Sequence, residues 1–129
     1  MTDDVHMLAY SVILAWLMIM TAASAQTKFN ILLALGNRDD LGEQTPLSER
    51  ADRAAKNMIE NLVLFVAAWA AAKGAGAVGW KLTRGAQLFF IARVVYFPLY
   101  LAGVKVVRTL VWSVGVVGIG LVLAAALTA

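Results

Sequence analysis

Four long apolar runs, separated by short polar segments, divide the chain. The first covers residues 5–25 and contains one histidine and no charged side chain. At about 1.5 Å per residue, a helix of this length crosses a hydrocarbon core of about 30 Å. The third and fourth runs, residues 85–102 and 109–129, also have sufficient length. The pattern therefore predicts three membrane-spanning helices over these runs.

The second apolar run is shorter, and a helix that spans the membrane there must include charged residues. The uncharged stretch from Asn61 to Ala72 falls short of the about 20 residues that a span requires. Extending the helix back to Arg53 gives sufficient length and places Glu60 inside the span. Ser48 is the predicted N-cap, because a serine side chain can accept a hydrogen bond from a first-turn N–H. We therefore expect a fourth membrane helix over residues 53–72.

The composition agrees with a membrane protein. Of the 129 residues, 61% are hydrophobic and only 15% are charged, whereas about 25% are charged in soluble domains. The mean hydropathy is +0.76. A soluble domain of this size leaves about a third of its surface in water and could not hide so much apolar area. We predict an all-α integral membrane protein, with a single four-helix membrane domain over residues 1–129.

The basic residues near the predicted span ends divide unequally between the two sides. Loops one and three carry the larger share, so the positive-inside rule places them in the cytoplasm and both termini on the opposite side. Their side has Lys28, Arg38, Arg50, Arg53, Lys56, Lys105 and Arg108, and the other has Lys73, Lys81 and Arg84. Away from the candidate site described below, we interpret Lys28, Arg38, Lys73, Lys81 and Arg84 as surface anchors.

Polar residues of the second and third spans form two stripes. The stripe in the second span has the spacing i, i+4, i+7, which keeps its members within about 60° of one another on a helix. The stripe in the third span has the spacing i, i+3, i+7. The two stripes are Arg53, Asn57 and Glu60, and Arg93, Tyr96 and Tyr100. An up-and-down topology brings both stripes to one end of the bundle, where Arg108 opens the fourth span. Such residues within a membrane are functional candidates.

A structural interpretation of the same residues stays open. Every acidic residue precedes or includes Glu60, so Glu60 is the one acidic partner that Arg93 can reach at membrane depth, and the two can simply neutralise each other. Tyr96 and Tyr100 can also belong to an interfacial aromatic belt. The four tryptophans are interpreted as packing or belt residues. Arg53 and Arg108 still lack acids, and unpaired cations favour an anionic ligand.

Several other functions are excluded. The chain has no cysteine and one histidine, so no cluster suggests a metal and no Ser-His-Asp set is available. The segment Gly74 to Gly79 matches G-x-G-x-x-G, but it follows a membrane helix and no acid comes after it to hold a ribose, so we interpret it as a loop. With 11 basic and 8 acidic residues, the net charge of +3 does not indicate nucleic-acid binding.

The segment Glu49 to Leu62, ERADRAAKNMIENL, resembles a signature of the membrane-associated proteins in eicosanoid and glutathione metabolism, the MAPEG family. That family's pattern runs approximately E-R-x-x-R-A-H-x-N-x-x-E-N. The segment Arg93 to Thr109, RVVYFPLYLAGVKVVRT, is similar to the family's second signature, and the resemblance covers all four spans.

The resemblance implies a microsomal glutathione transferase-like subunit that assembles as a homotrimer and binds glutathione between subunits near the cytoplasmic face. It implies that Arg53, Asn57 and Glu60 hold the tripeptide, that Tyr100 contacts it, and that Arg108 lies near its sulfur as the catalytic residue. Arg93 and Tyr96 complete the predicted glutathione site. The expected activity is a glutathione transferase or peroxidase that acts on hydrophobic electrophiles or lipid hydroperoxides entering from the bilayer.

Two departures from the family pattern favour a non-catalytic alternative. Ala55 replaces the histidine and Met58 stands where an aspartate is common. The stretch from Tyr100 to Arg108 is one residue shorter than in the best-known members, and Tyr96 falls where some members have histidine. In the alternative, the polar cluster binds glutathione or an anionic lipid without catalysis, or only fastens the trimer. A small multidrug-type transporter is disfavoured, because Glu60 beside Arg93 would bind cations poorly.

Overall fold

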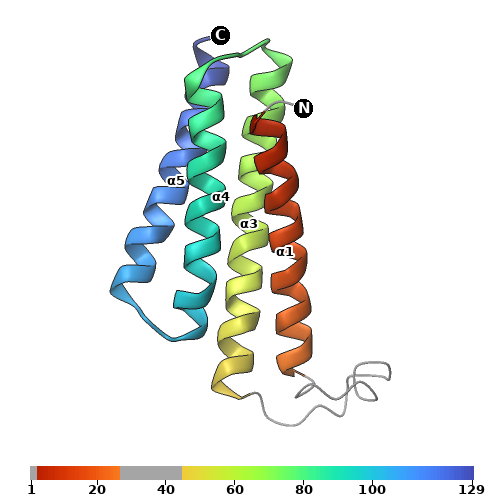
Figure 1. Cartoon of the computed structure of the whole chain (residues 1–129), viewed down its shortest axis with the longest axis vertical. Coiled ribbons are helices and arrows are strands. Elements are labelled where there is room, and N and C mark those ends of the chain that lie inside the picture. Colours follow the sequence, from red (N-terminus) through yellow and green to blue (C-terminus); the bar gives the residue numbers. More distant parts are fainter. Residues whose placement is uncertain (1–2, 27–44) are drawn as a thin grey trace.

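The computed structural model describes residues 3–26 and 45–129, and those ranges contain four α-helices. The helices are α1 (Asp3–Gln26), α3 (Pro46–Gly74), α4 (Trp80–Leu101) and α5 (Val106–Leu127). They lie side by side and run alternately up and down, with both termini at one end (Figure 1). The predicted all-α four-helix fold is confirmed. Lys28 and Arg38, which were counted among the basic residues of loops one and three, lie outside the described residues.

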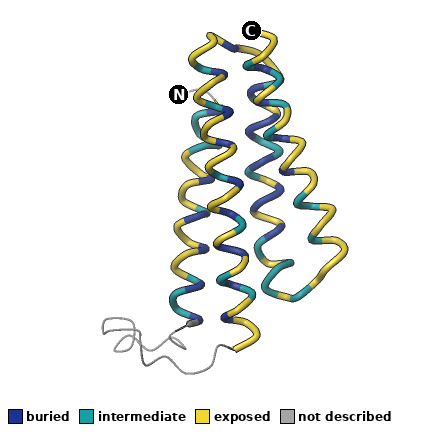
Figure 2. The backbone as a smooth tube through the Cα atoms, turned by 180° about the vertical axis from the view of Figure 1, so that it is seen from behind, coloured by how far each residue is buried: buried dark blue, intermediate teal, exposed yellow. Residues whose placement is uncertain are grey.

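Two of the described helices are long and apolar enough to cross a bilayer. They are α1, whose most apolar stretch has a mean hydropathy of 1.8, and α5, where the value is 2.4. Only 17% and 22% of these stretches are buried inside the protein, whereas the core helix of a soluble protein is mostly buried. Exposed residues cover the outer faces of the bundle (Figure 2). A lipid environment accounts for such apolar exposure, while four spans and the side of each loop stay predictions.

Helix α3 begins earlier than expected, and its N-cap is not Ser48. Thr45 is extended, and its hydroxyl accepts a hydrogen bond from the Ser48 backbone N–H at 3.0 Å. Pro46 follows in the first turn, where its missing N–H costs nothing. The prediction of Ser48 was wrong because Thr45-Pro46 gives the stronger start signal. The additional turns before Arg53 project α3 beyond its expected span.

Helix α4 ends with all of its last four carbonyl groups hydrogen-bonded. Three bonds come from the backbone N–H groups of the following turn, in which Gly103 has a φ of +77°. This is the Schellman arrangement, and its left-handed position favours glycine. The fourth carbonyl, that of Leu101, accepts a hydrogen bond from Arg50 Nε at 3.0 Å. Arg50 therefore ties the first turns of α3 to the end of α4.

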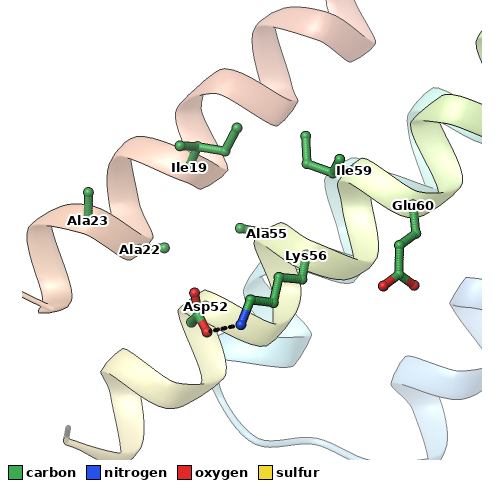
Figure 3. Close-up of a pocket in the computed structure, with 8 residues that line it drawn as sticks. All are labelled: Ile19, Ala22, Ala23, Asp52, Ala55, Lys56, Ile59 and Glu60. Atoms are coloured by element: carbon green, nitrogen blue, oxygen red, sulfur yellow. Dashed lines mark ion pairs between the residues drawn. The ribbon is translucent and has the colours of Figure 1, made fainter.

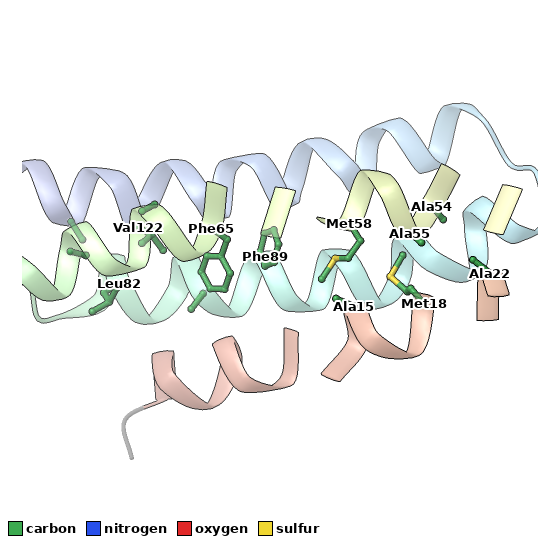
Figure 4. Packing of buried hydrophobic residues seen from close by; sticks show 14 of the residues in the cluster. Ala15, Met18, Ala22, Ala54, Ala55, Met58, Phe65, Leu82, Phe89 and Val122 are labelled. Carbon is green, nitrogen blue, oxygen red and sulfur yellow. The ribbon is translucent and has the colours of Figure 1, made fainter. Parts of the chain in front are cut away.

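The core is built from small and flexible apolar side chains, with one aromatic pair at its centre (Figure 4). The rings of Phe65 on α3 and Phe89 on α4 stack with their centroids 4.3 Å apart. Helices α4 and α5 are in close contact at Gly85 and Gly118, where a Cβ atom on either glycine would lie 2.6 Å from the carbonyl oxygen of the other. The absence of both side chains thus permits backbone contact between these helices.

A buried ion pair fastens α1 to α3 near the chain termini. The Asp4 carboxylate is 2% exposed, and its Oδ2 lies 2.8 Å from Lys73 Nζ. The same oxygen accepts a hydrogen bond from the Trp69 ring N–H at 2.8 Å. Lys73 was interpreted as a surface anchor and Trp69 as a packing or belt residue, so both interpretations missed this contact. The pair joins α1 to α3 at the end of the bundle opposite the candidate site.

Candidate functional site

A polar pocket of about 350 Å³ lies where α3, α4 and α5 meet, near the α4–α5 connection. It brings together six of the seven predicted site residues. Its lining is Arg53, Asn57 and Glu60 from α3, Tyr96 and Tyr100 from α4, and Arg108, Thr109 and Trp112 from α5. The helical spacings therefore place side chains from three helices around one space.

The pocket carries two cationic groups and one carboxylate. Arg53 has an ion pair with Glu49 at 3.4 Å, but both side chains are largely exposed, so this pair contributes little stability. Within the part of the chain that the structure describes, Arg108 and Glu60 form no ion pair at all. The lining therefore combines an excess of positive charge with one separate negative group, and both remain available to a ligand.

Two tyrosine rings lie between two arginine side chains, one in the pocket lining and one behind it. The Arg108 guanidinium carbon lies 4.3 Å from the centre of the Tyr100 ring. The Tyr100 and Tyr96 rings meet edge to face, with their centroids 5.4 Å apart. The Arg93 guanidinium carbon lies 4.3 Å from the Tyr96 ring. Cation–π contacts of this kind hold the arginine side chains in place. Tyr96 is buried, whereas Tyr100 is half-buried and packs against the core.

Arg93 lies behind the pocket and not in its lining. It is 1% exposed, and its Nη2 donates a hydrogen bond of 2.8 Å to Asn57 Oδ1. The Arg93–Glu60 ion pair, which the sequence left open as a structural alternative, does not occur among the described residues. The reason is helical phase: Glu60 is rotated by about 60° from Asn57 around α3, which turns it outward. Arg93 therefore contacts Asn57 from behind the pocket.

The bond from Arg93 fixes the orientation of the Asn57 amide. Because Asn57 Oδ1 accepts from Arg93 and also lies 3.3 Å from Asn61 Nδ2, the oxygen side of this amide faces its neighbours in the bundle. The Asn57 Nδ2 group is then left as a donor at the pocket. A donor beside Arg53 suits an anionic or carbonyl oxygen of a ligand.

Two residues of the pocket were not foreseen. Thr109 and Trp112 follow Arg108 by one and four positions, so Trp112 stands on the same helix face as that arginine. The Trp112 ring N–H is buried and has no hydrogen-bond partner among the described residues. Buried donors are normally paired, so this group indicates a place for an acceptor. The i, i+4 spacing from Arg108 was the available signal.

A second pocket, of about 440 Å³, lies on the other side of α3, between α3 and α1 (Figure 3). Its charged residues Asp52 and Lys56 pair with each other at 2.9 Å. The remaining lining is mostly apolar, and Glu60 is the one residue shared with the polar pocket. Glu60 therefore borders both pockets, and it is the one predicted site residue that lines the pocket beside α1.

The family comparison agrees with this geometry. The model of the MAPEG family matches residues 6–128, nearly the whole chain. The chain belongs to the MAPEG family. A comparison with curated proteins found no significant match. Membership makes the chain one of the membrane-associated MAPEG proteins, the general class of membrane glutathione transferases and eicosanoid-metabolising proteins.

The two departures from the MAPEG pattern do not alter the polar pocket. Met58 is fully buried in the core, and Ala55 is 7% exposed and lies in the pocket beside α1. Both departures therefore lie outside the lining of the polar pocket.

Proposed function

We propose that this MAPEG protein binds glutathione in the polar pocket and activates its thiol toward hydrophobic electrophiles or lipid hydroperoxides. The observation that carries the proposal is the set of charges in one pocket: Arg53 and Arg108 with Glu60. Glutathione has two carboxylates and one ammonium group, so its charges complement this set. Charge-assisted hydrogen bonds between such groups are shorter and stronger than neutral ones.

Each predicted residue then has a role that follows from its side chain. Arg53 and the Asn57 amide donate to a carboxylate of glutathione, and Glu60 accepts from its ammonium group. Tyr100 and Tyr96 supply the wall on which the peptide lies. The unpaired N–H of Trp112 offers a further donor. Arg93 holds Asn57 in place and touches no ligand.

Arg108 is the proposed catalytic residue. A thiol like that of cysteine is mostly protonated at neutral pH, and a nearby guanidinium lowers its pKa and raises the thiolate fraction. The thiolate then attacks an electrophilic carbon, a C–S bond forms, and the leaving group departs with its electron pair. With a hydroperoxide, two glutathione molecules are oxidised to the disulfide while the hydroperoxide is reduced to an alcohol and water.

The second substrate is proposed to be a hydrophobic small molecule that enters from the lipid. The chain is proposed to function as a homotrimer, and Glu60, which is exposed in the single chain, then lies where a neighbouring subunit can complete the pocket. Chemical cross-linking of the protein in membranes tests the assembly. A trimer is the expected product, and a protein that never cross-links beyond a monomer contradicts it.

Replacing Arg108 tests the catalytic role. We expect Arg108→Ala to lose glutathione conjugation of chlorodinitrobenzene while keeping its helical content. Arg84→Ala is the matched control, because Arg84 is exposed near the start of α4 and lies outside the pocket. Among the described residues, its side chain donates one hydrogen bond, to Gln87 Oε1 at 3.0 Å. An unchanged rate in Arg108→Ala would overturn the role of this residue.

A second candidate function is purely structural, and the bond between Arg93 and Asn57 favours it. This bond joins α4 to α3 at 2.8 Å and uses two of the polar side chains for packing. In that case Glu60 serves assembly as well. Glu60→Gln distinguishes the two functions: if the assembly dissociates and the wild-type protein never binds glutathione, the structural function is correct. A stable assembly with weakened glutathione binding supports the transferase.

A further inference from the structure

We propose that a basic pocket at the start of α3, which shares Arg53, Tyr100 and Arg108 with the polar pocket, binds the phosphate group of an anionic phospholipid, with the acyl chains lying along α5. This site goes beyond the proposed function and does not depend on glutathione binding. The pocket measures about 240 Å³ and lies between the first turns of α3 and the α4–α5 connection. Its lining is Pro46, Glu49, Arg50, Arg53, Tyr100, Gly103, Lys105 and Arg108.

The charge of this basic pocket is strongly positive. Four of its lining residues are cationic, and its one carboxylate, Glu49, already pairs with Arg53. Arg50 and Lys105 have no ion pair in the described part of the chain, and neither lines the polar pocket. These two cations therefore line the basic pocket and not the polar pocket. Basic pockets between membrane helices bind the phosphorylated headgroups of anionic lipids.

The Arg50 side chain is held in position before any ligand arrives. Its Nε donates to the Leu101 carbonyl at 3.0 Å, which leaves its two terminal nitrogens as donors. The guanidinium also packs against Gly103, where an added Cβ would lie 3.5 Å from Nη1. A fixed guanidinium loses little side-chain entropy when it grips a phosphate through two parallel hydrogen bonds. The loop glycine and the helix end therefore prepare Arg50 for an anion.

The first turn of α5 adds to the attraction. Lys105 is the N-cap residue, and its side chain makes no capping hydrogen bond. The N–H groups at the start of α5 therefore lack a side-chain acceptor, and a helix N-terminus carries a partial positive charge. Lys105 and Arg108 flank this turn. Phosphate is a ligand that suits both features.

The surroundings of the basic pocket favour a lipid over a free phosphate ion. Val106 next to it is 74% exposed. From there an apolar stripe continues along α5 through Leu110, Val114 and Val117, all of them exposed. Their spacing of i, i+4 and i+7 places them on one helix face. A phosphate at the pocket and an acyl chain on this stripe satisfy both parts of a phospholipid at once.

Lipid titration followed by native mass spectrometry tests the site. The purified full-length protein is incubated in detergent with dioleoylphosphatidylglycerol or, as the zwitterionic comparison, dioleoylphosphatidylcholine. We expect preferential retention of phosphatidylglycerol, and about fivefold weaker binding in Arg50→Gln and in Lys105→Gln, the loss that about one surface charge supplies. We expect Lys105→Gln to keep the fold, since the Lys105 side chain makes no hydrogen bond or ion pair in the described structure. Lys81→Gln, at the opposite end of the bundle, is the matched control.

The outcomes separate this site from general charge effects and from the proposed function. Equal retention of phosphatidylglycerol by wild type and both variants would overturn the proposal, as would an equal loss in Lys81→Gln. Displacement of phosphatidylglycerol by inorganic phosphate at similar concentration would overturn the lipid as occupant. Glutathione titrations of the same samples report on the polar pocket, so failure of one proposal is distinguishable from failure of the other.

Discussion

The close contact between α4 and α5 makes a quantitative prediction for Gly118. A Cβ atom placed there would lie 2.6 Å from the Gly85 carbonyl oxygen and 2.7 Å from the Phe89 backbone nitrogen. Ordinary contact begins at 3.4 Å, so the helices must separate by about 0.8 Å, the difference between 3.4 and 2.6 Å. Backbone atoms cannot rotate aside as a side chain does. Overpacking of this kind costs about 1–3 kcal/mol.

Gly120 provides the matched control on the same helix. A Cβ atom there meets no atom within 4 Å. Both Gly118→Ala and Gly120→Ala gain about 1 kcal/mol in helix propensity, so the difference between them isolates the clash. We expect Gly118→Ala to be less stable than Gly120→Ala by about 1–3 kcal/mol.

Thermal unfolding in one detergent, followed by far-ultraviolet circular dichroism, measures the difference. With a conversion of about 4 °C for each kcal/mol, the two variants should differ in Tm by about 4–12 °C. Equal Tm values for the two variants would refute the reasoning, because α4 and α5 would then not be in backbone contact at Gly118.

Two further substitutions test the buried polar groups. Asp4→Asn should lower the free energy of unfolding by about 1–3 kcal/mol, because it removes the charge facing Lys73. Asp3→Asn, at an exposed position, is the control and should leave the Tm unchanged. Equal changes in Tm for the two variants would contradict the buried ion pair. Arg93→Met should weaken glutathione binding about tenfold, because Asn57 loses the partner that orients its amide. Unchanged glutathione affinity in Arg93→Met, measured by calorimetry, would show that Arg93 does not position Asn57.

The helices were predictable because apolar length and helical spacing are local properties. The runs at residues 5–25 and 109–129 became α1 and α5 almost unchanged. The start of α3 was missed because Arg53 was chosen from the length of a span, whereas hydrogen bonding at Thr45 decides where the helix begins. A capping residue followed by proline was the stronger local signal.

The composition of the site was also predictable, but its internal contacts were not. The spacing of Arg53, Asn57 and Glu60 determines that they share a face of α3, and that face lines the polar pocket. Which of them meets Arg93 depends on how α3 is rotated against α4, and charge alone favoured Glu60. The packing selects Asn57, because Asn57 faces α4 and its side-chain oxygen accepts the hydrogen bond from Arg93, whereas Glu60 is turned outward on α3.

The dependence of contacts on helix packing also explains why the ion pair near the chain termini was missed. Lys73 has the sequence environment of a surface anchor, and its partner Asp4 lies in a different helix. Contacts of this kind depend on the arrangement of whole helices. Likewise, the sequence contains Gly118 and Gly120 in one short segment, and only the packing distinguishes the glycine in contact from the glycine facing outward.

Titration of the purified, detergent-solubilised protein with glutathione tests the central claim most directly. The heat of binding and the ultraviolet absorbance of the thiolate at neutral pH are followed together, in wild type and in Arg108→Ala. We expect saturable binding with a thiolate signal in the wild type, and loss of that signal in Arg108→Ala. Saturable binding without thiolate would contradict the activation of glutathione, and absence of binding would contradict the glutathione site itself.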